Sequence, residues 1–332
     1  GVCWTKHAQA PLSAIAYGSM GDEVPLATDS DRPWAIPLSM SDATDVFFDP
    51  KRGVYAWYGK MWIDGPDGRM AWKHAMGRSE SHDFLNWSTP ELVCLPDDDD
   101  APQVEFHTTP VFYHEGVYIC LNQVLDRAIG GGVIDVELML SRDGFDWRRP
   151  FRDELFLPRG PSGTFEGGSM FTNSTPIMLD DEMRFYYGGY SAGATSADNR
   201  RHVSGVGMAT LPRDRFAGIT PLERTDLPTQ RRPVENVGQV TLRKFSAQSA
   251  LSVQLNADAS EGSVRVEVLD SAGRRVPGYT RQDAIEICGD CLRHPVAWRD
   301  RQLEDLEPGQ YMLRLHLNRA TVYAVNWSIP VG

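Results

Sequence analysis

The chain has 332 residues, of which 41% are hydrophobic and 23% charged, and its formal net charge is −12. This length allows two domains with hydrophobic cores, and the composition is that of a folded globular protein. The acidic balance argues against a nucleic-acid partner, and no apolar run of about 18 residues is present that would span a membrane.

A motif with Asp and Trp occurs twice in the N-terminal half. It reads Ser-His-Asp-Phe-Leu-Asn-Trp-Ser-Thr-Pro over 81–90 and Ser-Arg-Asp-Gly-Phe-Asp-Trp-Arg-Arg-Pro over 141–150. Asp and Gly suit a tight turn, and the Trp packs back onto a sheet. Upstream, residues 42–55 align without a gap with 105–118, and each segment predicts strand, tight turn and strand. Repetition at this period is typical of a β-propeller with one sheet per blade.

A third unit begins near Phe165 and continues through 175–189 and 203–210, where the Trp-bearing turn is replaced. Three four-stranded blades cannot close a propeller, which typically has about four to eight. Residues 1–6 match the end of the repeated motif, and neither an initiator Met nor a signal peptide is present. We therefore expect an N-terminal truncation with a missing or partial blade; the alternative is that 5–37 supplies unrecognised strands. A secreted, periplasmic or cytoplasmic location stays open.

The sequence changes character after residue 222. Residues 221–233 are polar and proline-bearing, which is typical of a linker. Beyond them, apolar and polar residues alternate over 250–256, 263–269, 311–317 and 321–327, which predicts a β-sandwich. We therefore expect an all-β protein with propeller blades over 1–222, a linker over 223–233 and a β-sandwich over 234–332.

Cysteines and acidic runs give no clear metal or redox signal. The five cysteines are odd in number and widely spread, which argues against a disulfide framework. Cys288 and Cys291 form a lone C-x-x-C, for which a strand or turn position is favoured over a metal or redox role. The run Asp97 to Asp100 predicts a solvated loop rather than a calcium site, although a structural calcium ion stays open. No organic cofactor is expected.

Three segments, 141–150, 165–168 and 185–190, resemble bacterial glycosyl-hydrolase-like proteins related to the five-bladed propellers of glycoside hydrolase families 32, 43 and 68. The C-terminal part resembles the β-sandwich of those proteins, notably over 264–270. The likeness covers nearly the whole chain, but its motifs are blade-packing motifs and not catalytic signatures. It implies an Asp base or nucleophile, an Asp stabiliser and a Glu acid from successive blades.

Carboxylates at the start of the innermost strand of each blade are the candidate catalytic groups, because inner strands line the central channel. Asp42 and Glu105 hold the same place in the gapless alignment, and Glu166 opens the third unit in a similar place. Glycoside hydrolysis needs a protonated acid and a second carboxylate as base or nucleophile. By blade order, Asp42 is expected as stabiliser or base and Glu105 or Glu166 as acid.

Four further residues are expected to contact a saccharide substrate: Asp45 and His107 on the same rim, and Trp62 and Tyr190 as stacking platforms. The function that follows is a glycoside hydrolase. One alternative is a carbohydrate-binding or scaffold propeller without catalysis, and another is a sialidase-like hydrolase with an Arg triad and a Tyr nucleophile. The sugar, the linkage, the stereochemical course and the oligomeric state stay open.

Overall fold

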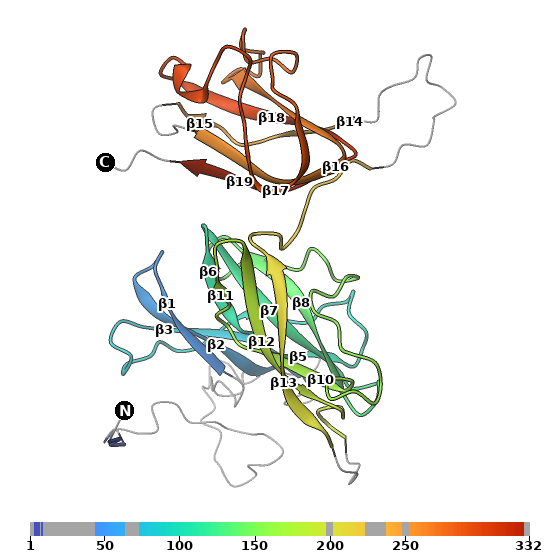
Figure 1. Ribbon diagram of the computed structural model, residues 1–332. Helices are drawn as coiled ribbons and strands as arrows, with labels where there is room; N and C mark the ends of the chain where they lie inside the picture. Colours follow the sequence, from blue (N-terminus) through green and yellow to red (C-terminus); the bar gives the residue numbers. More distant parts are fainter. Residues whose placement is uncertain are drawn as a thin grey trace. The chain divides into compact units, whose positions relative to one another are not determined.

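The computed structural model describes residues 3–6, 8, 44–63, 73–196, 202–222, 237–247 and 252–328. Strands dominate these residues, and the one helical element described is the 3₁₀ helix η1 (Leu303–Asp305), so the predicted all-β class is confirmed (Figure 1). The chain forms two compact units: an N-terminal unit of Gly1–Ile177 and Phe185–Ala209, and a C-terminal unit of Met178–Arg184 and Thr210–Gly332. Within the described part of the chain, no helix has the length and apolar character needed to cross a membrane.

Blade 1 is a four-stranded antiparallel sheet in chain order: β1 (Thr44–Asp49), β2 (Val54–Ile63), β3 (Lys73–Ser81) and β4 (Glu91–Cys94). β1 and β2 pair from Thr44↔Gly59 to Asp49↔Val54. The turn between them contains Gly53, whose φ of 70° is accessible to glycine at little cost. Blade 1 therefore begins with the predicted strand, tight turn and strand.

Blade 2 repeats this pattern with β5 (Val104–Thr108), β6 (Val111–His114), β7 (Val117–Asp126), β8 (Val133–Ser141) and β9 (Trp147–Arg148). β5 and β6 both pair with β7 and act as one inner strand, interrupted at Thr109 and Pro110 because proline cannot donate to the ladder.

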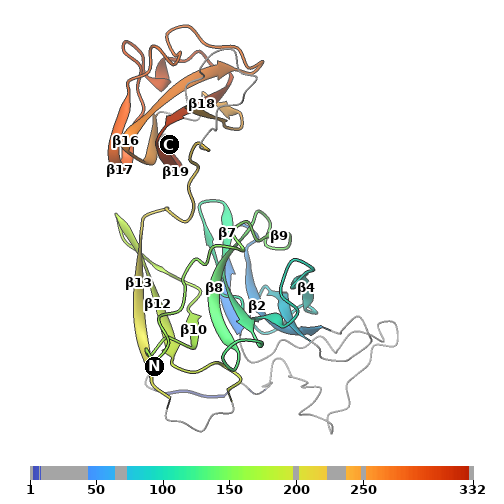
Figure 2. The same cartoon turned by 90° about the vertical axis from the view of Figure 1, so that its right-hand side faces the viewer.

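Blade 3 consists of β10 (Ser169–Thr172), β11 (Ile177–Met178), β12 (Glu182–Tyr190) and β13 (Ser204–Pro212), and it joins blade 2 through the parallel bridge Ser169↔Ile134. β12 and β13 run side by side in Figures 1 and 2. The sheets formed by the described strands stay open, which agrees with the incomplete propeller expected from the sequence.

The Asp-Trp turn of blade 2 is held by its own aspartate. Asp143 Oδ1 accepts the backbone N–H groups of Phe145 and Asp146, each at 2.8 Å. Ser141 Oγ accepts the N–H of Gly144 at 2.9 Å, and Gly144 has a φ of 83°. Asp143 is thus occupied within the turn.

The Asp-Trp turn of blade 1 has the same hydrogen bonds to its aspartate, but a phenylalanine stands where blade 2 has a glycine. Asp83 Oδ1 accepts the N–H groups of Leu85 and Asn86 at 2.8 and 2.7 Å. Phe84 takes the place of the glycine at a φ of 64°, a region that L-residues rarely adopt. Its ring contacts Trp87 edge-on, with centroids 5.4 Å apart.

A buried polar network joins blades 1 and 2. Arg78 is 1% exposed and Asp49 is 0% exposed, and Arg78 Nη2 lies 3.1 Å from Asp49 Oδ2. The Tyr118 hydroxyl donates to Asp49 Oδ2 at 2.8 Å, and the Tyr58 hydroxyl donates to the carbonyl oxygen of Gly144 at 2.9 Å. The network therefore connects β1, β3 and β7 with the Asp-Trp turn of blade 2.

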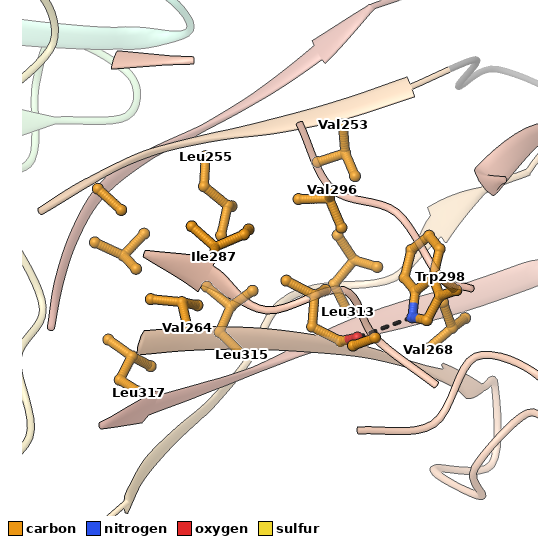
Figure 3. Close-up of a cluster of buried hydrophobic side chains, with 14 of the residues drawn as sticks. Val253, Leu255, Val264, Val268, Ile287, Val296, Trp298, Leu313, Leu315 and Leu317 are labelled. Atoms are coloured by element: carbon orange, nitrogen blue, oxygen red, sulfur yellow. Dashed lines mark hydrogen bonds between the residues drawn. The ribbon is translucent and has the colours of Figure 1, made fainter. Parts of the chain in front are cut away.

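The C-terminal unit is built on a six-stranded sheet of β14 (Val237–Thr241), β15 (Phe245–Ser246), β16 (Ser252–Asp270), β17 (Ile287–Pro295), β18 (Gln310–Asn318) and β19 (Thr321–Ser328). The long strand β16 pairs with β19 along its first half and with β18 along its second half. The sheet encloses one apolar core, in which Trp298 Nε1 donates to the carbonyl oxygen of Val266 at 2.9 Å (Figure 3). The predicted linker 223–233 lies outside the described residues.

Gly144→Ala is expected to destabilise the protein more than Gly116→Ala. Both glycines have a positive φ, 83° and 84°, where a Cβ costs about 1–2 kcal/mol. A Cβ on Gly144 would also collide with Arg78 Nη1 and lie 2.7 Å from the Tyr58 hydroxyl, whereas a Cβ on Gly116 meets nothing within 4 Å. Disturbing these buried bonds adds about 2 kcal/mol. Urea unfolding of the two variants measures the difference, and equal losses would contradict the role given to the network.

Candidate functional site

The inner strands β1, β5 with β6, and β10 with β11 carry or adjoin the predicted site residues. Asp42 lies outside the described residues. The other six lie within the described residues.

Glu105 on β5 is a buried carboxylate, 1% exposed. Its Oε2 accepts the backbone N–H of His74 at 2.9 Å and lies 2.9 Å from His74 Nδ1, and its Oε1 contacts Arg127 Nε. Burial acts to raise the pKa of Glu105, but the hydrogen bonds from His74 and the charge of Arg127 outweigh it and lower the pKa below its ordinary value. The site therefore holds Glu105 as an ionised carboxylate.

Trp62 joins this cluster through His74. The two rings are 3.7 Å apart between centroids and tilted by 41°. Burial lowers the pKa of His74, so the imidazole is neutral at pH 7. Trp62 is half-buried against His74, so its ring already has a stacking partner within the protein.

Asp45 on β1 connects blade 1 with blade 3. Its carboxylate accepts hydrogen bonds from the hydroxyl and the backbone N–H of Ser174, which follows β10, and from the N–H of Val46 at 2.9 Å. Burial nevertheless dominates and raises the pKa of Asp45. Every other resolved carboxyl shift among the described residues is downward, so Asp45 differs in this respect from Glu105.

Glu166 precedes β10 and is held by a tyrosine. The Tyr187 hydroxyl donates to Glu166 Oε2, and the ring of Phe165 stacks on that of Tyr187 with centroids 6.4 Å apart. Burial and the bond to Glu166 raise the pKa of Tyr187 to about 12. Glu166 thus has a partner different from those of Glu105 and Asp45.

His107 and Tyr190 are linked by an aromatic chain. The ring of Phe171 meets His107 edge-on at 5.2 Å and Tyr190 edge-on at 5.5 Å. Tyr190 is 45% exposed, so part of its ring is open to solvent.

The register of blade 3 separates this aromatic chain from Glu166. Ser169 pairs with Tyr190 and Phe171 with Gly188, whereas Thr172 pairs with Tyr187. Successive residues of a strand point to opposite faces, so Phe171 and Tyr190 share one face and Tyr187 lies on the other. The structure therefore brings together Trp62 with Glu105, and His107 with Tyr190, while Glu166 sits with Tyr187.

The sequence did not indicate the residues that determine the charge states of Glu105 and Asp45. His74 and Arg127 hold Glu105, and Ser174 holds Asp45, yet none of the three stands in a recognisable motif. The one available signal was the position of Asp45 near the start of the aligned segment, three residues after Asp42.

Three of the four aspartates 97–100, Asp97, Asp99 and Asp100, form ion pairs with arginines. Asp97 pairs with Arg152, and Asp100 pairs with Arg149 at 2.5 and 2.7 Å. Asp100 is largely buried, so the run is only partly the solvated loop that the sequence predicts. A cavity of about 480 Å³ lies beside these arginines, near β4 and β9, and no predicted site residue lines it. Among the described residues, no three His, Cys, Asp or Glu side chains gather as a metal site.

These observations define an all-β protein with propeller blades and inner-strand carboxylates in contrasting environments. No family model matches the sequence, and no curated protein matches it. Solved structures that share a likeness in fold include an N-acetylgalactosamine deacetylase from F. plautii in complex with blood group B trisaccharide, at 17% identity and a TM-score of 0.41 over 55% of this chain and 54% of that chain.

A family 117 glycoside hydrolase from the marine bacterium Zobellia galactanivorans gives 14% identity and a TM-score of 0.41, covering 65% of this chain and 62% of that chain. A family 43 arabinoxylan arabinofuranohydrolase from Bacillus subtilis, in complex with cellotetraose, gives 15% identity and a TM-score of 0.34, covering 88% of this chain and 67% of that chain. The chain spans about half the length of the first solved structures that it matches. Similarity at this level is limited to fold.

The contribution of Glu105 to stability is expected to depend on pH. Its folded-state pKa lies below the ordinary value of 4.5, so the stabilisation is fully present above that pH and is lost as the pH falls through the folded-state pKa. Glu105→Gln should cost about 2 kcal/mol at pH 7, because charge-assisted bonds to His74 and Arg127 are lost. The cost should shrink toward pH 3 in urea unfolding.

Glu182→Gln is the matched control, because Glu182 pairs with Arg184 in a partly exposed position. Its effect is expected to stay below about 1 kcal/mol, the range of surface ion pairs. A cost for Glu105→Gln that is independent of pH would contradict an ionised Glu105.

Proposed function

We propose that the protein is a carbohydrate-active enzyme that hydrolyses O-glycosyl bonds with inner-strand carboxyl groups as acid and base or nucleophile. One observation carries this proposal: burial raises the pKa of Asp45, while His74 and Arg127 lower that of Glu105. When their surroundings raise the pKa of one carboxyl group and lower that of another, the first can donate a proton at a pH at which the second is ionised.

In this proposal Asp45 donates a proton to the leaving glycosidic oxygen as the bond to the anomeric carbon breaks. A carboxylate, with Glu105 the leading candidate, activates water or attacks the anomeric carbon. Asp42 and Glu166 remain candidates for the stabilising or acid role of a further carboxyl group. Tyr190 offers a partly open ring for a sugar, with Phe171 and His107 behind it.

A binding protein without catalysis is the second candidate. Glu105 already has two basic partners and Glu166 accepts from Tyr187, so both carboxylates are occupied within the protein. The sialidase-like alternative needs a tyrosine that ionises readily. Tyr187, whose pKa is raised to about 12, does not favour it.

A screen of aryl glycosides and oligosaccharides tests the enzyme, with Asp45→Asn and Glu105→Gln as variants. Each is expected to lower kcat at least about 100-fold, the smaller end of general acid–base contributions. Asp146→Asn is the control, because Asp146 is exposed and pairs only with Arg148 in the structure described. Saccharide binding without turnover by the unmodified protein would select the binding candidate.

Tyr190→Ala is expected to raise KM up to about tenfold and to leave kcat nearly unchanged, because a stacking ring contributes about 0.5–1.5 kcal/mol to binding and touches no reacting atom. Tyr186→Ala is a matched control, since Tyr186 is similarly exposed on the same strand. Equal effects of the two changes would argue against a sugar platform at Tyr190.

A further inference from the structure

Two aromatic rings lie directly on glycines in blade 3. A Cβ on Gly189 of β12 would lie 2.7 Å from Phe165 Cε2, and a Cβ on Gly205 of β13 would lie 3.0 Å from Phe165 Cδ2. A Cβ on Gly207 of β13 would collide with the ring of Tyr187. Glycine in a strand allows another group to approach the backbone closely, and here it brings both rings onto one face of the sheet.

The rings of Phe165 and Tyr187 form one surface, which is called the aromatic floor here. Their planes are 11° from parallel and their centroids are 6.4 Å apart. Each ring lies over different glycines of the same sheet face, so the two rings are offset along the sheet. Both residues are half-buried, so part of each ring is open to solvent. The aromatic floor therefore offers two neighbouring apolar surfaces of nearly the same orientation.

Glu166 lies at the edge of the aromatic floor. Its Oε2 accepts a hydrogen bond from the Tyr187 hydroxyl. Its side chain also lies over glycines: a Cβ on Gly160 would lie 2.8 Å from Glu166 Oε1, and a Cβ on Gly189 would lie 2.9 Å from Glu166 Cβ. A carboxylate can accept about four hydrogen bonds, and Tyr187 supplies one of them. Glu166 is half-buried, so it can accept further bonds from hydroxyl groups on the aromatic floor.

An apolar surface beside a hydrogen-bond acceptor matches a pyranose sugar, whose faces carry C–H groups and whose rim carries hydroxyl donors. Successive sugars of a β-1,4-linked chain are related by half a turn, so the chain is a flat ribbon. An α-1,4-linked chain winds, and its neighbouring rings do not share a plane. The carboxylate of Glu166, in a chain of net charge −12, favours a neutral saccharide over an acidic one.

We propose that the aromatic floor binds two neighbouring sugars of a neutral β-1,4-linked oligosaccharide. Phe165 contacts one sugar, Tyr187 contacts the next, and Glu166 accepts hydrogen bonds from their hydroxyl groups. This inference rests on the proposed function and names the class of glycan for it. The aromatic floor is separate from the ring of Tyr190, because Tyr190 and Phe171 point to the opposite face of the sheet.

Calorimetric titration of the full chain with cellotriose tests the proposal, with maltotriose as the α-linked counterpart. We expect cellotriose to bind at least about fivefold more tightly, because only the flat chain covers both rings. Phe165→Leu keeps an apolar cover over the glycines and should weaken cellotriose binding about fivefold, because the flat ring is lost. Glu166→Gln should weaken it severalfold, because hydrogen bonds to a charged acceptor are lost.

Tyr186→Leu is the matched control, because Tyr186 is exposed on β12 and points to the face opposite Tyr187. It is expected to leave cellotriose binding unchanged, and urea unfolding checks that each variant is folded. Three results would overturn the proposal: no binding of cellotriose, equal binding of maltotriose, or equal losses for Phe165→Leu and Tyr186→Leu.

Chromatography of the sample after the titration shows whether cellotriose has been cleaved, so binding and hydrolysis are measured separately. Cellotriose that binds at the aromatic floor and stays intact supports the floor and counts only against the proposed hydrolysis. A loss of binding in Tyr190→Ala but not in Phe165→Leu contradicts the floor and leaves the proposed hydrolysis untouched.

Discussion

The buried pair of Asp49 and Arg78 is the constraint on which the described propeller blades depend. Removing two charges from water is costly, so both side chains must be fully engaged by the fold. Tyr118 of blade 2 donates to Asp49, and Arg78 contacts the hydroxyl of Tyr58. Tyr58 in turn donates to the Asp-Trp turn at Gly144. Blade 1, blade 2 and their turn can satisfy these groups in one relative arrangement, which fixes the spacing of the inner strands.

Burial and the choice of partner also explain why the pKa values of Asp45 and Glu105 shift in opposite directions. Glu105 is more buried than Asp45, yet its pKa falls while that of Asp45 rises. The difference lies in their partners: Glu105 meets a histidine ring and a guanidinium, whereas Asp45 meets the neutral hydroxyl and N–H of Ser174. Neutral donors only partly replace water around a carboxylate, so burial wins at Asp45.

Local turns were predictable from the sequence to a useful degree. The aligned segments 42–55 and 105–118 predict strand, turn and strand, and both turns form with a glycine, Gly53 and Gly116, at positive φ. Phe84 departs from the pattern, since it takes a left-handed conformation without being glycine. The hydrogen bond from its backbone N–H to Ser81 Oγ and its ring contacts with Tyr55 and Trp87 hold it there. Such compensation depends on neighbours that a local sequence pattern does not contain.

By itself, the sequence determined the all-β class and the strand–turn–strand pattern of the two aligned segments, because turn chemistry and alternation act over a few residues. It also singled out Glu105, which lies on β5. Only the tertiary structure decided which partner each acid receives: His74 with Glu105, Ser174 with Asp45, and Tyr187 with Glu166. These pairs join residues 21 to 129 positions apart. A carboxyl group's protonation depends on the groups within a few ångströms in space, and sequence separation does not specify them.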